Sequence, residues 1–175
     1  VCREDKPERL FALLSLHELD VVLADAPPGA GVSVRAFSHP LGECGVSVFG
    51  APEVAATHRR RFPRSLAGAP FLLPAEGTTL RRSLEQWFEQ TGVRPRIAAE
   101  FDDSALLKVV GQAGHGLFAA PTVIEKEIVR QYRVRVVGRV AAVRERFYAV
   151  TVERRLRNPA ALAISNAARA ELFQA

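Results

Sequence analysis

Cysteine is scarce in this chain of 175 residues, where only Cys2 and Cys44 are present. So few thiols cannot build a disulfide framework, and neither they nor the histidines show the spacing of zinc ligands. Free thiols are the rule in reducing compartments, so we expect both cysteines to be reduced. The scarcity of cysteine argues against a small disulfide-rich scaffold and against a structural zinc site.

Long apolar runs are also absent. No run approaches the roughly 18 residues that a transmembrane helix needs, and no signal peptide opens the chain. The sequence begins at Val1 without a methionine and enters a strand-like stretch, residues 1–3, almost at once. We therefore expect a fragment whose N-terminal part is absent, and we expect no membrane partner.

Lysine is rare, so arginine supplies most of the positive charge behind the formal net charge of +5. The basic residues are spread along the chain and are densest at 58–64, which is either a solvated loop or a contact with DNA or a DNA-bound partner. Catalytic patterns are missing: no serine lies in a G-x-S-x-G turn, and a small apolar thiol in a strand explains Cys44 better than a nucleophile does. We therefore expect a binding domain and not an enzyme.

Short apolar runs alternate with amphipathic segments along the chain. A hydrophobic content of 48% is enough for a real core. Strand followed by helix with tight turns predicts an α/β fold with mainly parallel sheets. A surface connection with at most a short helix is expected over 51–69. Strands are expected at 1–3, 19–24, 32–37, 44–49, 70–74, 96–101, 116–120, 133–137 and 146–152, and helices at about 5–14, 80–91, 103–110, 122–132 and 159–173.

The stretch 101–122 shows this alternation most clearly. A strand ends at Phe101, Asp102 or Asp103 can cap the following helix, and a short buried strand precedes Pro121. The glycines of 111–116 are similar to a phosphate-binding loop, but they follow a helix and precede a strand. Phosphate loops need glycines before a helix, so we interpret these glycines as a turn.

Polar residues follow several of the expected strands, where parallel sheets bind their ligands. Thr78 and Thr79 lie between a strand and a helix; they form either a plain helix cap or a cap that also holds a polar ligand. Asp25, Asp102 and Asp103 also follow strands. Turn and capping roles explain them, whereas carboxylates that line a common cleft would favour a hard cation.

Longer strings of the sequence resemble the effector-binding domain of LysR-type transcriptional regulators over nearly the whole chain. The strings are ELDVVLA at 18–24, after a helix, and GQAGHGLFAAP at 111–121. More narrowly, further strings resemble the NhaR branch of this family, the activators of sodium/proton antiporter genes. These are LGECGVS at 41–47, EFDDSAL at 100–106, APT at 120–122 and GRV at 138–140.

The resemblance implies a two-lobed α/β fold like that of type-2 periplasmic binding proteins, with the effector in the cleft. Lobe I would comprise 1–46 and 150–175, lobe II would comprise 47–149, and two strands would cross between them. The first strand and helix of lobe I would be absent from this chain. The N-terminal winged helix-turn-helix domain of the family, which binds DNA, would be absent too.

The resemblance also implies which residues line the cleft. Each of them follows a strand or starts a helix in the family pattern. They would be Arg3, Glu4, Asp25 and Ala26 in lobe I, and Thr78, Thr79, Phe101, Asp102, Pro121 and Thr122 in lobe II. The NhaR branch responds to sodium, so Asp25 and Asp102 are the suggested Na⁺ ligands, and no other cofactor is expected.

The function implied by the resemblance is effector sensing, or co-inducer binding, in a cytoplasmic transcriptional activator. The signal would be Na⁺ or another small ligand of the cleft, and DNA would be bound by the N-terminal domain. The full-length protein would be a homodimer or homotetramer, with residues near 3–11 and 87–96 at the contact. The alternative is a solute-binding protein of a transport system for a small polar ligand, which shares the fold and carries a signal peptide.

Overall fold

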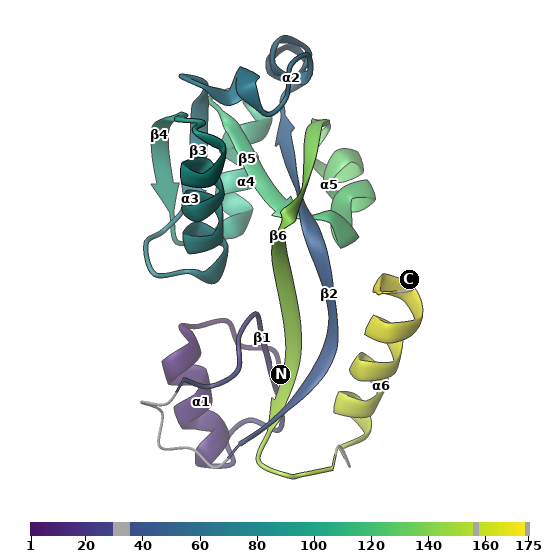
Figure 1. Ribbon diagram of the computed structural model, residues 1–175. Coiled ribbons are helices and arrows are strands. Elements are labelled where there is room, and N and C mark those ends of the chain that lie inside the picture. Colours follow the sequence, from purple (N-terminus) through teal and green to yellow (C-terminus); the bar gives the residue numbers. More distant parts are fainter. Residues whose placement is uncertain (30–35, 156–157, 174–175) are drawn as a thin grey trace. The chain divides into compact units, whose positions relative to one another are not determined.

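The structure is a computed structural model that describes residues 1–29, 36–155 and 158–173. The chain divides into two compact units: unit 1 consists of Val1–Glu43 with Arg146–Ala175, and unit 2 consists of Cys44–Glu145. Both points of division lie inside long strands, β2 (Phe37–Gly50) and β6 (Arg135–Thr151) (Figure 1). The lobe boundaries expected from the resemblance, after residues 46 and 149, fall in the same two strands.

The strands are hydrogen-bonded in the order β1-β6-β2-β5-β3-β4. The shorter strands are β1 (Val22–Ala24), β3 (Pro70–Pro74), β4 (Arg96–Phe101) and β5 (Leu117–Pro121). Strand β3 pairs in parallel with β4 and β5, whereas β2–β5 and β1–β6 are antiparallel pairs. The predicted α/β fold is confirmed, but its sheet is mixed, because the two long strands run against their neighbours.

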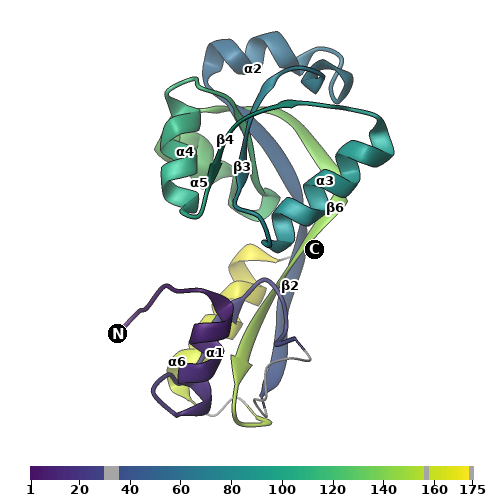
Figure 2. The ribbon, with the colours of Figure 1, turned by 90° about the vertical axis from the view of Figure 1, so that its left-hand side faces the viewer.

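Helices cover both faces of the strands in unit 2, as Figure 2 shows for α3 on one side and α4 with α5 on the other. The helices of this unit are α2 (Pro52–Arg59), α3 (Thr79–Thr91), α4 (Ser104–Gln112) and α5 (Glu125–Tyr132), with short 3₁₀ turns at Arg64–Leu66 and Thr122–Ile124. Side chains of a strand alternate between faces. Phe71 and Leu73 therefore pack with Trp87 of α3, whereas Leu72 packs with Leu107 of α4.

Unit 1 has the same layered construction on a smaller scale. Its helices are α1 (Pro7–Ser15) and α6 (Pro159–Ala167), and α6 continues into a π-helical turn, Ala168–Leu172. Phe11 and Leu14 of α1 pack on Val150 of β6, and the preceding residue, Ala149, packs with Ala168 in a separate cluster. None of the described helices has the length and apolar character needed to cross a bilayer.

Several expected elements differ from the observed ones. The two strands expected at 133–137 and 146–152 are one continuous strand, β6, because Val140 and Val143 are buried between them and no turn interrupts the chain. The strand expected at 19–24 is reduced to β1. The strand expected at 32–37 lies mostly outside the described residues.

Two further differences concern segments that the sequence suggests are irregular. The connection over 51–69 contains one short helix, α2, as the prediction allows, but it buries Ala55 and Leu66 in the core of unit 2 and is therefore not confined to the surface. Strand β2 begins at Phe37, well before the expected residue 44, and runs through Pro40 and several glycines. Pairing with neighbouring strands keeps these residues extended despite their low strand propensity.

Candidate functional site

The carboxyl ends of three parallel strands meet at one edge of unit 2. Pro74, the last residue of β3, lies opposite Phe101, the last residue of β4, and β3 also pairs in parallel with β5. The amide of Ala75 donates to the carbonyl of Phe101 at 2.8 Å, which fixes the two ends together. We call residues 75–79, 101–103 and 121–122 the carboxyl edge. All six site residues predicted for lobe II belong to it.

The start of α3 is capped by Thr78. Its hydroxyl oxygen accepts from the amide of Arg81 at 3.3 Å and donates to the carbonyl of Ala75 at 3.1 Å. The other end of the helix stops at Gly92, whose φ of 67° suits a residue without Cβ. Thr78 is thus a true helix cap and is exposed, while Thr79 is half-buried in the first turn. That Thr78 and Thr79 contact a ligand stays a prediction.

The structure at the start of α4 shows which of the two candidate aspartates, Asp102 or Asp103, caps this helix. Asp103 is the cap, since its Oδ1 accepts from the amides of Ala105 at 2.7 Å and Leu106 at 3.3 Å. Asp102 is exposed and its carboxylate takes no part in this cap. A carboxylate that is not needed for capping remains available at the carboxyl edge.

The turn that follows β5 begins with Thr122, whose hydroxyl oxygen is buried. Within the described part of the chain, Thr122 Oγ1 has no hydrogen-bond partner, and such a group costs about 1–3 kcal/mol unless a ligand or water satisfies it. Nearby, the amides of Thr122 and Val123 donate to the sulfur of Cys44. Burial raises the pKa of the Cys44 thiol, and these two amides lower it only in part.

Arg81, in the first turn of α3, was not among the predicted site residues. It is only 6% exposed, and its Nη1 donates to the carbonyl of Pro74 at 3.1 Å and to Glu100 Oε1 at 2.8 Å. Its Nε pairs with Glu85 Oε1, one turn further along the helix. Burial lowers the pKa of Arg81, but the hydrogen bonds that it donates to both carboxylates raise the pKa by more. The sequence displays the Arg81–Glu85 spacing but no signal for Glu100.

A second polar network lies behind the carboxyl edge at the start of α5. Glu125 accepts from the buried hydroxyl of Ser47 at 2.6 Å and from Arg139 Nε and Nη2 at 2.9 and 2.7 Å. The Arg139 hydrogen bonds hold the pKa of Glu125 below its usual value; burial opposes this, and the Ser47 bond adds to it. The network joins α5 to β2 and β6, and the sequence contains no local signal for it.

The site residues predicted in unit 1 are less well supported by local structure. Arg3 and Glu4 are exposed and belong to no helix or strand, so the strand end expected at 1–3 is wrong. Asp25 and Ala26 do follow a strand, β1, and are half-buried. Among the described residues, no cluster of three or more His, Cys, Asp or Glu could hold a metal ion. The pairing of Asp25 with Asp102 at a Na⁺ stays a prediction.

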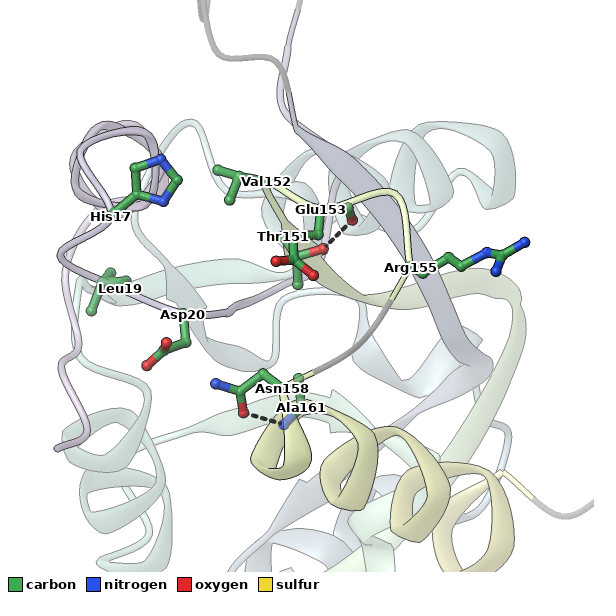
Figure 3. A pocket seen from close by; sticks show the side chains of 9 residues that line it. All are labelled: His17, Leu19, Asp20, Thr151, Val152, Glu153, Arg155, Asn158 and Ala161. Carbon is green, nitrogen blue, oxygen red and sulfur yellow. Dashed lines mark hydrogen bonds between the residues drawn. The ribbon is translucent and has the colours of Figure 1, made fainter.

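Unit 1 also contains a hollow of about 350 Å³ (Figure 3). The carboxylate of Glu153 and the side-chain amide of Asn158 line the hollow, while the side chain of Arg155 points away from the other labelled residues. Asn158 Oδ1 caps α6, accepting from the amides of the first turn. The lining residues are His17, Leu19, Asp20, Thr151, Val152, Glu153, Arg155, Asn158 and Ala161. None of the predicted site residues is among them.

Comparison with known proteins gives a consistent answer. The family described as LysR substrate binding domain matches residues 2–172. The chain is 34% identical over 175 residues to the transcriptional activator protein NhaR of Escherichia coli K12, covering 98% of this chain and 56% of that protein. NhaR of Shigella flexneri matches to the same extent. The chain thus spans about half the length of the curated relatives that it matches.

Solved structures of low sequence identity share the fold. The regulatory domain of OxyR2 from Vibrio vulnificus, in its reduced form, superimposes with a TM-score of 0.68 at 16% identity, covering 95% of this chain and 78% of that one. The effector domain of AmpR from Pseudomonas aeruginosa has a TM-score of 0.66 at 20% identity, covering 91% and 76%. The resemblance inferred from the sequence strings is confirmed: this chain belongs to the LysR substrate-binding domain family and is similar to NhaR.

Proposed function

We propose that this chain is the effector-sensing domain of a DNA-binding transcriptional activator, and that its signal is Na⁺ or another small polar ligand. The observation that carries the proposal is the carboxyl edge, where the buried Thr122 hydroxyl has no partner among the described residues and Asp102 is not used as a cap. Membership of the LysR family and similarity to a transcriptional activator support it.

The chemistry of the carboxyl edge suits a hard cation. Hydroxyl, carboxylate and backbone carbonyl oxygens are the groups that bind such ions, and Thr122, Asp102 and the turn carbonyls supply them. The chain's part in the function is binding and not catalysis. Binding can change activity only as far as the ligand prefers one conformation or assembly over another.

The rest of the proposal concerns the longer protein. DNA is bound by a helix-turn-helix domain outside this chain, and the regulator acts in the cytoplasm as a homodimer or homotetramer. Residues near 3–11 and 87–96 contribute to the contact between copies. Light scattering of the full-length protein tests the assembly, and a monomer at high concentration contradicts it.

The sodium signal is tested by thermal unfolding of the chain in NaCl, LiCl and KCl, with choline chloride holding the ionic strength constant. For a site with a Kd of about 10 mM, 300 mM Na⁺ stabilises the folded chain by about 2 kcal/mol. We expect Na⁺ to raise Tm more than K⁺ does. Identical curves in the three salts contradict a sodium effector.

Variants of the carboxyl edge locate the response. Asp102→Asn removes the charge of one proposed ligand and Thr122→Val removes the hydroxyl of another, and we expect either one to abolish the difference between Na⁺ and K⁺. Glu127→Gln is the matched control, because Glu127 is an exposed acid of α5 outside the carboxyl edge. A response that survives in both Asp102→Asn and Thr122→Val places the ion elsewhere and contradicts this site.

A further inference from the structure

We infer that Arg81 is a positioning residue of the carboxyl edge, which sets the ends of β3 and β4 and the start of α3 in one fixed arrangement. Its guanidinium contacts all three elements: Pro74 at the end of β3, Glu100 near the end of β4, and Glu85 on α3 itself. The effect of Arg81 on the effector rests on the proposed function, whereas its effect on the geometry does not.

The backbone of the same residue completes the arrangement. The amide of Arg81 donates to the Thr78 hydroxyl, which in turn donates to the carbonyl of Ala75. The amide of Ala75 donates across to the carbonyl of Phe101. Arg81 therefore contacts Thr78 of the carboxyl edge through its main chain, and through its side chain it contacts Pro74 and Glu100, which directly precede the edge in β3 and β4. The residue is buried.

Arginine is required for this set of contacts because its planar guanidinium presents several donors in fixed directions. Nη1 donates to the Pro74 carbonyl and to Glu100, while Nε donates to Glu85. A lysine ammonium has the charge but not the geometry, and methionine has a similar length without either. Buried ion pairs often add little to net stability compared with apolar side chains, so stability alone does not reveal this role.

Site geometry reveals the role, since a ligand site depends on residues that hold its direct contacts in place. Without the guanidinium, the hydrogen bond from Ala75 to Phe101 remains as the link that the described residues show between the ends of β3 and β4 beyond the ladder itself. We expect the Thr78 turn and the Asp102 turn to move independently. A ligand that contacts both turns must then order them when it binds, and the free energy this costs weakens its binding.

Amide hydrogen exchange of the 175-residue chain, followed by NMR, tests the geometric part without any ligand. We expect the Ala75 amide to exchange about tenfold faster in Arg81→Met and to be partly restored in Arg81→Lys. Amides in the β1–β6 ladder of unit 1 serve as an internal reference and keep their rates. The matched control is Arg130→Met, which changes an exposed arginine of α5.

A milder variant keeps the test decisive if Arg81→Met does not fold. Glu100→Gln removes one charged partner and leaves the bonds of Arg81 to Pro74 and Glu85. We expect it to accelerate exchange at Ala75 by about threefold, against no change in Arg130→Met. An Ala75 rate that equals the control rate in Glu100→Gln overturns the inference.

Sodium titrations of the same variants test the consequence for the effector site, with NaCl as the probe. We expect about tenfold weaker binding in Arg81→Met, about threefold weaker binding in Glu100→Gln, and wild-type binding in Arg130→Met. If the wild-type chain itself does not respond to Na⁺, the proposed sodium signal fails and hydrogen exchange still decides the inference. Faster exchange with unchanged sodium affinity overturns the role of Arg81 at the effector site.

Discussion

Replacing Glu125 by glutamine tests whether the network behind the carboxyl edge stabilises unit 2. The carboxylate is 16% exposed, Ser47 is buried, and Arg139 is 68% exposed. Solvent screens the attraction between Glu125 and Arg139. We therefore assign the loss of stability in Glu125→Gln to the weakened hydrogen bond from Ser47. A hydrogen bond to a charged acceptor is worth about 1 kcal/mol more than one to a neutral acceptor, which glutamine still offers. We therefore expect Glu125→Gln to cost about 1 kcal/mol.

Glu125→Ala is expected to cost more, because it leaves the Ser47 hydroxyl buried without an acceptor. That change adds the desolvation cost of the hydroxyl, about 1–3 kcal/mol. The assay is urea unfolding followed by fluorescence of Trp87, the single tryptophan, which lies in the core of unit 2. With a slope of about 1 kcal/mol per molar urea, glutamine lowers the midpoint by about 1 M.

The lowered pKa of Glu125 predicts how the stability difference between wild type and Glu125→Gln changes with pH. The pKa of Glu125 in the folded chain lies below its usual value of 4.5, so the carboxylate stabilises the folded chain above about pH 4.5. This stabilisation is lost as the pH falls through the lowered folded value. The difference between wild type and Glu125→Gln must therefore shrink toward pH 3. A difference of the same size at pH 7 and pH 3, or one no larger than for Glu127→Gln, refutes the reasoning.

The remaining predictions concern helix caps, packing and thiol reactivity. Asp103→Ala removes the cap of α4 and should cost about 1 kcal/mol in urea unfolding, whereas Asp102→Asn should cost nothing measurable; equal costs contradict the cap assignment. Gly111→Ala places a Cβ against the ring of Phe118 and should cost about 1–3 kcal/mol, while Gly29→Ala, with open space around it, is the neutral control. Ellman's reagent at pH 8 should label exposed Cys2 about tenfold faster than half-buried Cys44, and Cys2→Ser should leave only the slow phase.

Local signals in the sequence located the elements around the carboxyl edge. Strands β3 and β4 have the bounds that were predicted, 70–74 and 96–101, because turn residues and helix caps limit them on both sides. Thr78 was predicted as a cap for the same local reason. The prediction that the residues after three parallel strands gather at one edge of unit 2 is confirmed, whereas their contact with a ligand stays a prediction.

Long-range pairing explains where the prediction failed. The prediction ended one strand at residue 137 and began the next at 146, yet residues 138–145 are extended within β6, which lies between two neighbouring strands. In unit 1 the predicted contacts Arg3 and Glu4 depended on a strand at 1–3 that does not form. A strand exists only where a partner pairs with it, and a single sequence does not show the partner.

The sequence by itself determined the alternation of strands and helices, the Thr78 cap and the family, because these depend on neighbouring residues and on strings that stay together in the chain. The tertiary structure decided which aspartate caps α4, that Thr122 Oγ1 is buried without a partner among the described residues, and that Arg81 holds Pro74 and Glu100. It also brought Ser47 to Glu125, which lies 78 residues away in the chain. Burial and hydrogen bonding between distant residues are properties of the folded chain, so local sequence patterns do not contain them.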